Sequence, residues 1–458
     1  MKPDRRYREQ GSRSTDDWKV LRFVGIGGIG MSALARYFNE RGESVSGYDR
    51  TASPLTAKLV EEGMKVEFEA NPEAVKAADV VIYTPAVPSD HTELEAAREA
   101  GIPLLKRSAV LGELSRDRFT IAVAGSHGKT TVSSMIAHIL QLSGYGCTAF
   151  LGGIATNFNS NYIGGKDDVV VVEADEFDRS FLQLEPDIAV VTAIDTDHLD
   201  VYGDQASLEA AFIEFVQQVK DGGKLIAKWA LPVHDHFRGI SRSYSLGEDA
   251  ADWFASELEV SALGSRFKVN RISQSLALSW PGIHNVENAI AAAAVAALLD
   301  IPDAKIAEAL ASFKGISRRF QVRHWDASGL YVDDYAHHPE EIRALLNSIR
   351  SITKEEITVI FQPHLFTRTR DLADGFAEAL SLAHRVILLP IYPAREEPIG
   401  GVSSSLIASR ISDSSEVKLM IRDEVLDYLS KGLPPVLLTV GAGDIDRITD
   451  AIADLYRA

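Results

Sequence analysis

Residues 119–140, FTIAVAGSHGKTTVSSMIAHIL, join an apolar run, a glycine-rich turn and an amphipathic segment. This order predicts a strand, a phosphate-binding loop and a helix that begins near Thr130. Gly125 and Gly128 let backbone N–H groups turn inward around an anion, and the helix N-terminus adds positive partial charge at the same place. Lys129 adds a full charge, and phosphate-binding loops hold Mg²⁺ with the hydroxyl that follows the lysine. The sequence therefore predicts a nucleoside triphosphate site with Thr130 as a metal ligand.

The spacing of this loop is shorter than the usual pattern. Val123 occupies the position of the first glycine, and only two residues separate Gly125 from Gly128. An ordinary glycine-rich turn between a strand and a helix is the alternative, but Gly-Lys-Thr-Thr in this setting is a specific combination. We therefore expect a shortened variant of the phosphate-binding loop.

Length and composition limit the remaining possibilities. A chain of 458 residues has room for several domains, and we expect three. The net charge of −18, from 47 basic and 65 acidic residues, argues against nucleic acid or an anionic membrane as a partner. Because Cys147 is the only cysteine, we expect no internal disulfide, no cysteine-bound metal cluster and a reducing compartment. The sequence has no apolar run of about 20 residues, so we expect no membrane-spanning helix. Residues 1–17 are polar and lack the apolar core of a secretion signal, which predicts a disordered tail. We therefore expect a cytoplasmic protein.

Residues 18–117 are predicted to form an α/β domain. A strand at 20–26 leads into glycines at 25, 27 and 30, which satisfy the G-x-G-x-x-G fingerprint, and Asp49 follows at the end of a second strand. Taken alone, this pattern predicts NAD binding. The fingerprint requires only a pyrophosphate close to the backbone at a helix N-terminus, which several nucleotide diphosphates supply. It therefore leaves both NAD and another nucleotide diphosphate open.

Residues 118–316 are predicted to form a central domain around the phosphate-binding loop. Two apolar strands, at 168–172 and 187–194, lead to Glu173 and to His198. Ligands of an open parallel sheet gather at the carboxyl ends of its strands, so both side chains are candidate metal ligands beside the loop hydroxyl. A solvated loop carboxylate and a helix-capping histidine are the alternatives.

Three further features follow the metal candidates in the chain. Residues 220–280 show short alternating runs, which predict an antiparallel insertion. Asn288 precedes a helix predicted at 289–299, where its amide could read a purine edge or cap the helix. Arg318 and Arg319 then lie in a segment that we interpret as a hinge carrying two cations, with a plain basic linker as the alternative.

Residues 317–458 are predicted to form a third α/β domain. A strand ends at Asp334, and Pro339 suits the first turn of the helix that follows. His337 and His338 are adjacent and cannot both easily face one ion. We therefore expect polar substrate contacts here instead of a metal site.

With these motifs in chain order, the sequence resembles the Mur ligases of peptidoglycan synthesis over residues 18–458. A series of motifs at domain-scale spacing is more specific than any one of them. The matching segments are GIGGIGMSALA at 25–35, GSHGKTT at 125–131, EADEFDRSF at 173–181, DTDHLDVYG at 195–203, GIHNVENA at 282–289, RRF at 318–320, DDYAHHP at 333–339, FQPHLFTRTRD at 361–371 and EEPIGG at 396–401.

The resemblance implies three α/β domains. These are a Rossmann-like UDP-sugar-binding domain, a central P-loop ATPase-type domain with the small antiparallel insertion, and a Rossmann-like amino-acid-binding domain. It also implies that the first glycine loop holds the diphosphate of a UDP sugar and not NAD. The most similar branch joins L-alanine to UDP-N-acetylmuramate, which implies an ATP-dependent ligase that uses Mg²⁺, with two ions bound. We expect a monomer or a homodimer.

The resemblance further implies roles for individual residues. One Mg²⁺ would be held by Thr130 and Glu173, and a second by His198. The catalytic residues would be Lys129, His198, Arg319 and His337. The ATP-binding residues would be Gly125, Ser126, His127, Gly128, Lys129, Thr130, Thr131, Asn288, Arg319 and Asp334. The UDP-sugar-binding residues would be Gly27, Gly28, Ile29, Gly30, Met31, Ser32, Asp49 and Arg107. The incoming amino acid would meet Tyr335, His337, His364 and Arg368.

Departures from the family pattern are small. Ser126 stands where threonine is usual, Ala336 where glycine is frequent and Ala33 where many members have glycine, and none of these removes a reacting group. Sister ligases carry a carbamoylated lysine that helps to hold the second metal, but residues 208–215 contain no lysine, which favours the alanine-adding branch. Two alternatives remain: a recycling ligase that attaches a tripeptide to the same UDP sugar, and an NAD-dependent oxidoreductase with an incidental phosphate loop.

Overall fold

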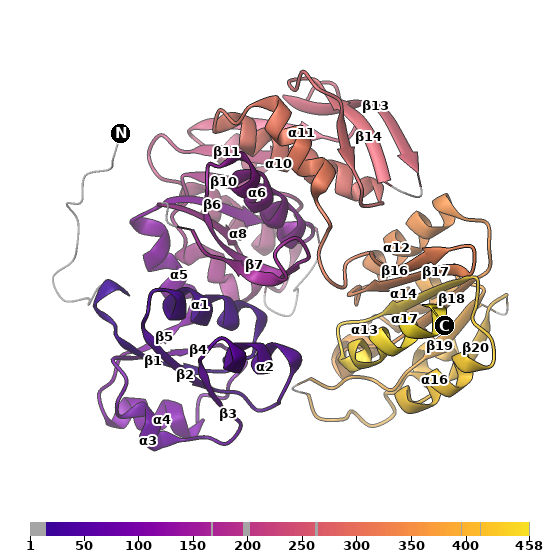
Figure 1. The fold of residues 1–458 in the computed structure, drawn as a ribbon, viewed down its shortest axis with the longest axis horizontal. Coiled ribbons are helices and arrows are strands. Elements are labelled where there is room, and N and C mark those ends of the chain that lie inside the picture. Colours follow the sequence, from indigo (N-terminus) through magenta and orange to yellow (C-terminus); the bar gives the residue numbers. More distant parts are fainter. Residues whose placement is uncertain are drawn as a thin grey trace. The chain divides into compact units, whose positions relative to one another are not determined.

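The chain forms three β-sheets, of five, ten and six strands (Figure 1). The computed structural model describes residues 15–165, 168–195, 202–261, 264–394, 396–412 and 414–457. These residues pack as two compact units. Apart from the short stretches 260–264 and 281–283, the first unit holds residues up to 314 and the second holds the rest. The first two sheets therefore belong to the first unit, and the third sheet forms the core of the second unit.

The first sheet is parallel, with the strand order β3-β2-β1-β4-β5. Its central strand β1 is almost wholly apolar, and its side chains at Leu21 and Phe23 are fully buried. Thr15–Asp17, at the end of the predicted tail, form a 3₁₀ turn, whereas residues 1–14 lie outside the described part. The elements are η1 Thr15–Asp17, β1 Val20–Val24, α1 Ile29–Glu40, β2 Ser44–Tyr48, α2 Pro54–Glu61, β3 Lys65–Glu67, α3 Pro72–Val75, β4 Val80–Tyr83, α4 Thr92–Glu99, β5 Leu104–Lys106 and α5 Arg107–Arg116.

The second sheet has the strand order β15-β14-β13-β12-β11-β10-β6-β9-β7-β8. β6 lies between β10 and β9 and runs parallel to both, so the phosphate-binding loop leaves the sheet at its middle. The elements are β6 Phe119–Ala124, α6 Lys129–Ser143, β7 Thr148–Ala155, β8 Ser160–Ile163, β9 Val169–Glu173, η2 Phe177–Gln183, β10 Ile188–Val191, α8 Gln205–Gln217, β11 Lys224–Lys228, α9 Val233–His236, β12 Ile240–Ser245, β13 Trp253–Ser261, β14 Gly264–Val269, β15 Leu276–Leu278, α10 Ile283–Leu298 and α11 Asp303–Ser312.

The prediction of an antiparallel insertion at 220–280 is wrong for the first part of this range. β11 and β12 continue the parallel sheet, since β11 pairs in parallel with β10 and β12 in parallel with β11. Antiparallel pairing follows between β14 and β15. Alternation of apolar and polar residues reports that one face of a strand is buried, but it does not report strand direction. Helix α10 also begins earlier than predicted, at Ile283, so Asn288 lies inside the helix.

The third sheet has the strand order β16-β17-β21-β18-β19-β20. β16 and β17 form an antiparallel pair, and the other neighbours are parallel. Pro339 occupies the first turn of α12 as predicted, and the ring of His338 accepts a hydrogen bond from the backbone N–H of Glu340. The elements are β16 Gln321–Asp326, β17 Gly329–Asp334, α12 Pro339–Ile352, β18 Ile357–Phe361, α13 Phe366–Asp371, α14 Ala373–Leu380, β19 Arg385–Leu388, α15 Ser405–Ala408, β20 Glu416–Leu419, α16 Arg422–Ser430, β21 Val436–Val440, η3 Asp444–Ile448 and α17 Thr449–Arg457.

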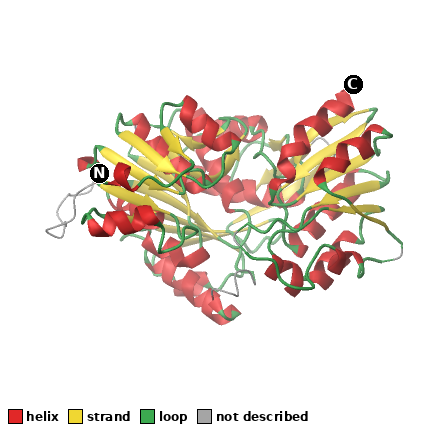
Figure 2. Ribbon diagram, turned by 90° about the horizontal axis from the view of Figure 1, so that it is seen from below, coloured by secondary structure: helices red, strands yellow, loops and turns green. Residues whose placement is uncertain are grey.

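Helices flank the strands within each unit, as expected for sheets with parallel strands (Figure 2). The central strands are correspondingly apolar on both faces: all five residues of β18 and of β21 are buried. Among the described residues, no helix combines the length and the apolar character needed to cross a membrane.

Candidate active site

The phosphate-binding loop connects β6 to α6 and is clamped onto the segment that follows β10. The hydroxyl of Ser126 donates to the carbonyl of Asp195 at 3.0 Å and accepts from the N–H of Asp195 at 2.9 Å. Gly128 adopts a left-handed conformation, with φ of +81°. A Cβ at Gly128 would lie 2.7 Å from Oδ1 of Asn288, so the glycine lets this amide approach the loop. The structure thus brings Asn288 to the phosphate-binding loop.

Lys129 begins α6 and points back into the loop. Its Nζ donates to the carbonyl of Gly125 at 2.7 Å and forms an ion pair with Oε1 of Glu176 at 2.8 Å. Burial alone would lower the pKa of Lys129, but the carboxylates of Glu176, Glu173 and Asp175 outweigh it and raise that pKa. Lys129 is therefore a largely buried cation at neutral pH.

Two oxygen ligands suited to Mg²⁺ lie on adjacent elements. Glu173 ends β9, opposite Val123 of β6, and its Oε2 accepts from the N–H of Gly152 at 2.8 Å. Thr130 lies in the first turn of α6 and is 2% exposed. A hydroxyl and a carboxylate are hard oxygen ligands of the kind Mg²⁺ prefers, and phosphate oxygens and water can complete its coordination. The described residues therefore fit Mg²⁺ bound together with a nucleotide.

The second predicted metal site cannot be placed. His198 lies outside the described residues, which end at 195 and resume at 202. Within the part of the chain that the structure describes, no three His, Cys, Asp or Glu side chains are grouped as metal ligands. Two further residues predicted to bind ATP lie in or beside the phosphate-binding loop. Nε2 of His127 is 3.8 Å from the carboxylate of Asp195. Thr131 is buried in α6.

The first glycine turn, between β1 and α1, holds several of the predicted UDP-sugar contacts. The N–H of Gly27 donates to Oδ2 of Asp49 at 2.8 Å, so this carboxylate shapes the turn itself. A Cβ at Gly30 would lie 1.7 Å from Nη1 of Arg107, which shows that the guanidinium rests directly on the start of α1. Gly28 and the half-exposed Ile29 complete this surface.

Ser32 and Met31 are not on that surface. Ser32 is fully buried, its N–H donates to the carbonyl of Gly28 at 2.8 Å, and its hydroxyl donates to the carbonyl of Ile29 at 3.0 Å. Its hydroxyl also accepts from the side-chain amide of Asn161 at 2.9 Å. Met31 is 2% exposed. Both side chains therefore pack inside the first unit and away from the surface of the first glycine turn.

Arg107 also links the first glycine turn to the acidic segment after β9. Its Nη2 lies 3.4 Å from Oδ2 of Asp175, and the neighbouring Lys106 lies 3.2 Å from Oδ2 of Asp178. The sequence analysis assigns no role to these two carboxylates. Their pairing with the first domain joins residues far apart in the chain, which no local pattern reports.

In the second unit, Asp334 lies at the end of β17, and its carboxylate accepts hydrogen bonds from two backbone N–H groups. Its Oδ2 accepts from the N–H of Phe320 at 2.6 Å and its Oδ1 accepts from the N–H of Ala336 at 2.7 Å. Burial raises the pKa of Asp334 to about 6, against the effect of these two hydrogen bonds. Arg319 lies nearby, in a tight turn in which its N–H donates to the carbonyl of Ile316 at 3.1 Å.

An aromatic cluster collects three of the residues predicted to meet the amino acid. The rings of Tyr335 and His337 are 5.4 Å apart, and those of His337 and His364 are 6.2 Å apart. Tyr392, which the sequence did not indicate, stacks on His364 at 5.8 Å. The predicted cation Arg368 lies on α13, close enough to influence the ring of His337.

The surroundings of His337 favour its neutral imidazole form. Burial is the main cause that lowers the pKa of His337. Its Nδ1 lies 3.1 Å from the carbonyl of Tyr335, which can only accept, so Nδ1 carries the proton. Nε2 is then the basic nitrogen, which suits this ring to accept a proton from an amine.

Comparison with known proteins agrees with this arrangement of sheets and loops. Three family models match in order: "Mur ligase family, catalytic domain" over residues 20–119, "Mur ligase middle domain" over 123–296 and "Mur ligase, glutamate ligase domain" over 318–443. The UDP-N-acetylmuramate–L-alanine ligase of Flavobacterium johnsoniae is 44% identical over 439 residues, covering 94% of this chain and 96% of the relative. The UDP-N-acetylmuramate–L-alanine ligase of Flavobacterium psychrophilum is 45% identical over 435 residues, covering 93% of this chain and 95% of the relative.

Solved structures show the same similarity. The crystal structure of a UDP-N-acetylmuramate–alanine ligase from Thermotoga maritima superposes with a TM-score of 0.82 at 30% identity, covering 96% of this chain and 99% of that one. A murein peptide ligase from Psychrobacter arcticus superposes with a TM-score of 0.71 at 22% identity, covering 96% and 98%, and at this identity it supports the fold alone.

Proposed function

The chain belongs to the Mur ligase family, and from that premise we propose that it joins L-alanine to the lactyl carboxylate of UDP-N-acetylmuramate at the expense of ATP. The observation that carries the proposal is the largely buried cation Lys129 at the phosphate-binding loop, with Thr130 and Glu173 beside it. High identity over nearly the whole length of alanine-adding relatives supports the choice of amino acid. The product would be UDP-N-acetylmuramoyl-L-alanine, made in the cytoplasm for peptidoglycan synthesis.

A carboxylate and an amine do not condense spontaneously in water, because the carboxylate oxygen is a poor leaving group. The proposed reaction therefore first activates the carboxylate. In the proposed first step, a lactyl carboxylate oxygen attacks the γ-phosphorus of ATP, the bond to ADP breaks and an acyl phosphate forms. Lys129 and Arg319 would stabilise the charge on the transferring phosphoryl group. Mg²⁺ held by Thr130 and Glu173 would neutralise phosphate charge there, and His198 is the proposed ligand of a second ion.

In the proposed second step, the amine of L-alanine attacks the acyl carbon, and the tetrahedral intermediate collapses with release of phosphate. Tyr335, His364 and Arg368 would surround the amino acid, while Nε2 of His337 would take the proton that the amine loses. Asn288 would contact adenine and Asp334 the ATP ribose. These groups belong to both compact units, so we propose that the units close around the substrates and exclude water.

A steady-state assay of ADP release tests this proposal. The enzyme would be supplied with ATP, Mg²⁺ and UDP-N-acetylmuramate, and with L-alanine, glycine, L-serine or the murein tripeptide in turn. We expect the highest kcat/KM with L-alanine. Release of ADP with the tripeptide and with no single amino acid would identify a recycling ligase instead and refute the proposal.

A further inference from the structure

Arg318 is unusually well held for a residue in a linker between a helix and a strand. It lies between α11 and β16, and its side chain is only 17% exposed. Nη2 donates to the carbonyl of Gly441 at 2.5 Å, and Nη1 lies 3.4 Å from the carbonyl of Gly443. The guanidinium thereby binds the loop that follows β21, the central strand of the third domain.

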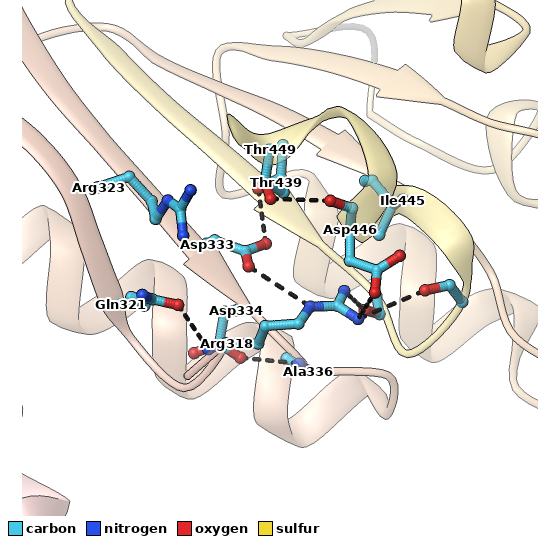
Figure 3. Close-up of polar contacts among 12 residues, drawn as sticks. Arg318, Gln321, Arg323, Asp333, Asp334, Ala336, Thr439, Ile445, Asp446 and Thr449 are labelled. Atoms are coloured by element: carbon cyan, nitrogen blue, oxygen red, sulfur yellow. Dashed lines mark hydrogen bonds and ion pairs between the residues drawn. The ribbon is translucent and has the colours of Figure 1, made fainter. Parts of the chain in front are cut away.

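The same guanidinium binds the end of β17. Nε lies 3.4 Å from Oδ2 of Asp333, a carboxylate that is 1% exposed. Oδ1 of Asp333 accepts from the hydroxyl of Thr439 on β21 at 2.8 Å, so the carboxylate is itself fixed (Figure 3). The cation also lies over the ring of Tyr335, at 5.4 Å from its centroid. Arg318 therefore ties β17, β21 and the linker together through one planar group.

The backbone around Arg318 is strained and is held from several directions. Arg318 and Phe320 both have positive φ, of +61° and +44°, and they flank Arg319. A non-glycine residue in this region is strained and persists only where its surroundings determine it. Here the carbonyl of Arg318 accepts from the N–H of Tyr335 at 2.5 Å, and the N–H of Phe320 donates to Asp334.

We propose that Arg318 is the positioning residue for Arg319. By holding residues 318–320 on the ends of β17 and β21, it fixes the direction in which the neighbouring guanidinium leaves the backbone. It also fixes Asp334 and Tyr335, which contact the same three residues. The guanidinium of Arg318 itself is turned into the domain, toward Asp333 and the loop after β21. The inference rests on the proposed contact between Arg319 and the transferred phosphoryl group.

The first test compares Arg318→Lys with Arg323→Lys. Lysine keeps the charge of Arg318 but cannot bind the carboxylate and two carbonyls in a single plane. Arg323 on β16 is a matched control, because its side chain is 18% exposed and pairs with Asp450 in the same domain. We expect Arg318→Lys to lower kcat about tenfold with unchanged KM for UDP-N-acetylmuramate, since its effect falls on the transition state. Arg323→Lys should retain kcat, and equal kcat values for the wild type and Arg318→Lys would overturn the inference.

A double-mutant cycle separates positioning from a general loss of structure. In an Arg319→Ala background, Arg318→Lys should lower kcat less than twofold, because two residues that act through one group are not additive. An undiminished tenfold loss in that background would overturn the inference. Amide hydrogen exchange at Phe320 provides an independent readout, and it should speed up in Arg318→Lys and not in Arg323→Lys. If Arg319→Ala alone leaves kcat unchanged, the proposed phosphate contact fails, whatever the outcome for Arg318.

Discussion

The ammonium group of Lys129 illustrates how single residues prepare this site. It is shared between the carbonyl of Gly125 and the carboxylate of Glu176, which is 1% exposed. An isolated ammonium would be costly to bury, so the pair keeps the charge in place without a ligand. When a triphosphate binds, its oxygens can take over part of this role. The transferring phosphoryl group would then meet a cation that needs no reorganisation.

Lys129→Ala should abolish product formation, with kcat reduced about 1,000-fold or more, because it removes a charge from the phosphoryl transfer. Binding of UDP-N-acetylmuramate, measured by titration calorimetry, should be retained, since the predicted UDP-sugar contacts lie in the first domain. Lys220→Ala is a suitable control: Lys220 is another partly buried lysine of the central domain, paired with Asp187 at 2.9 Å. It should lower the melting temperature and retain kcat. Turnover by Lys129→Ala would refute the assigned role.

At the scale of elements, the segment formed by β6, the phosphate-binding loop and α6 is the part of the site that the local sequence predicts best. An apolar strand, two glycines and a helix start lie next to one another, so short-range physics determines them. Strands β18 at Ile357–Phe361 and β21 at Val436–Val440 are short apolar runs for the same reason.

Features that depend on distant partners could not be predicted in this way. The packing of Arg107 against Gly30 and Asp175 joins three segments, and no spacing in the sequence reports it. The parallel pairing of β11 and β12 depends on where the chain crosses the sheet and not on residue type. Ser32, on helix α1, is likewise buried where it contacts Asn161, which lies on strand β8.

Gly128→Ala tests the loop as an element. The new Cβ would strain a left-handed residue and would lie 2.7 Å from Asn288. Gly144→Ala, at the other end of α6, is a matched control, because Gly144 has the same φ of +81° but no atom within 4 Å of the added Cβ. Both variants should lose about 1 kcal/mol of stability in chemical denaturation. Only Gly128→Ala should raise the KM for ATP, about tenfold or more, and equal KM values for the two variants would contradict the role of the loop.

At the scale of the whole molecule, the proposed chemistry is divided between two compact units. Lys129, Thr130 and Asn288 belong to the first unit, and Arg319 and His337 belong to the second. The proposed mechanism therefore needs groups from both units, and exclusion of water would protect the acyl phosphate from hydrolysis. The central claim of the account is that ATP activates the carboxylate by phosphorylating it.

Transfer of ¹⁸O from substrate to phosphate tests this central claim most directly. UDP-N-acetylmuramate would be labelled with ¹⁸O at both oxygens of the lactyl carboxylate and converted with ATP and L-alanine. One labelled oxygen should remain in the amide carbonyl of the product and one should leave with inorganic phosphate, as mass spectrometry would detect. Inorganic phosphate that contains no ¹⁸O would contradict the account, because the carboxylate would not have been phosphorylated.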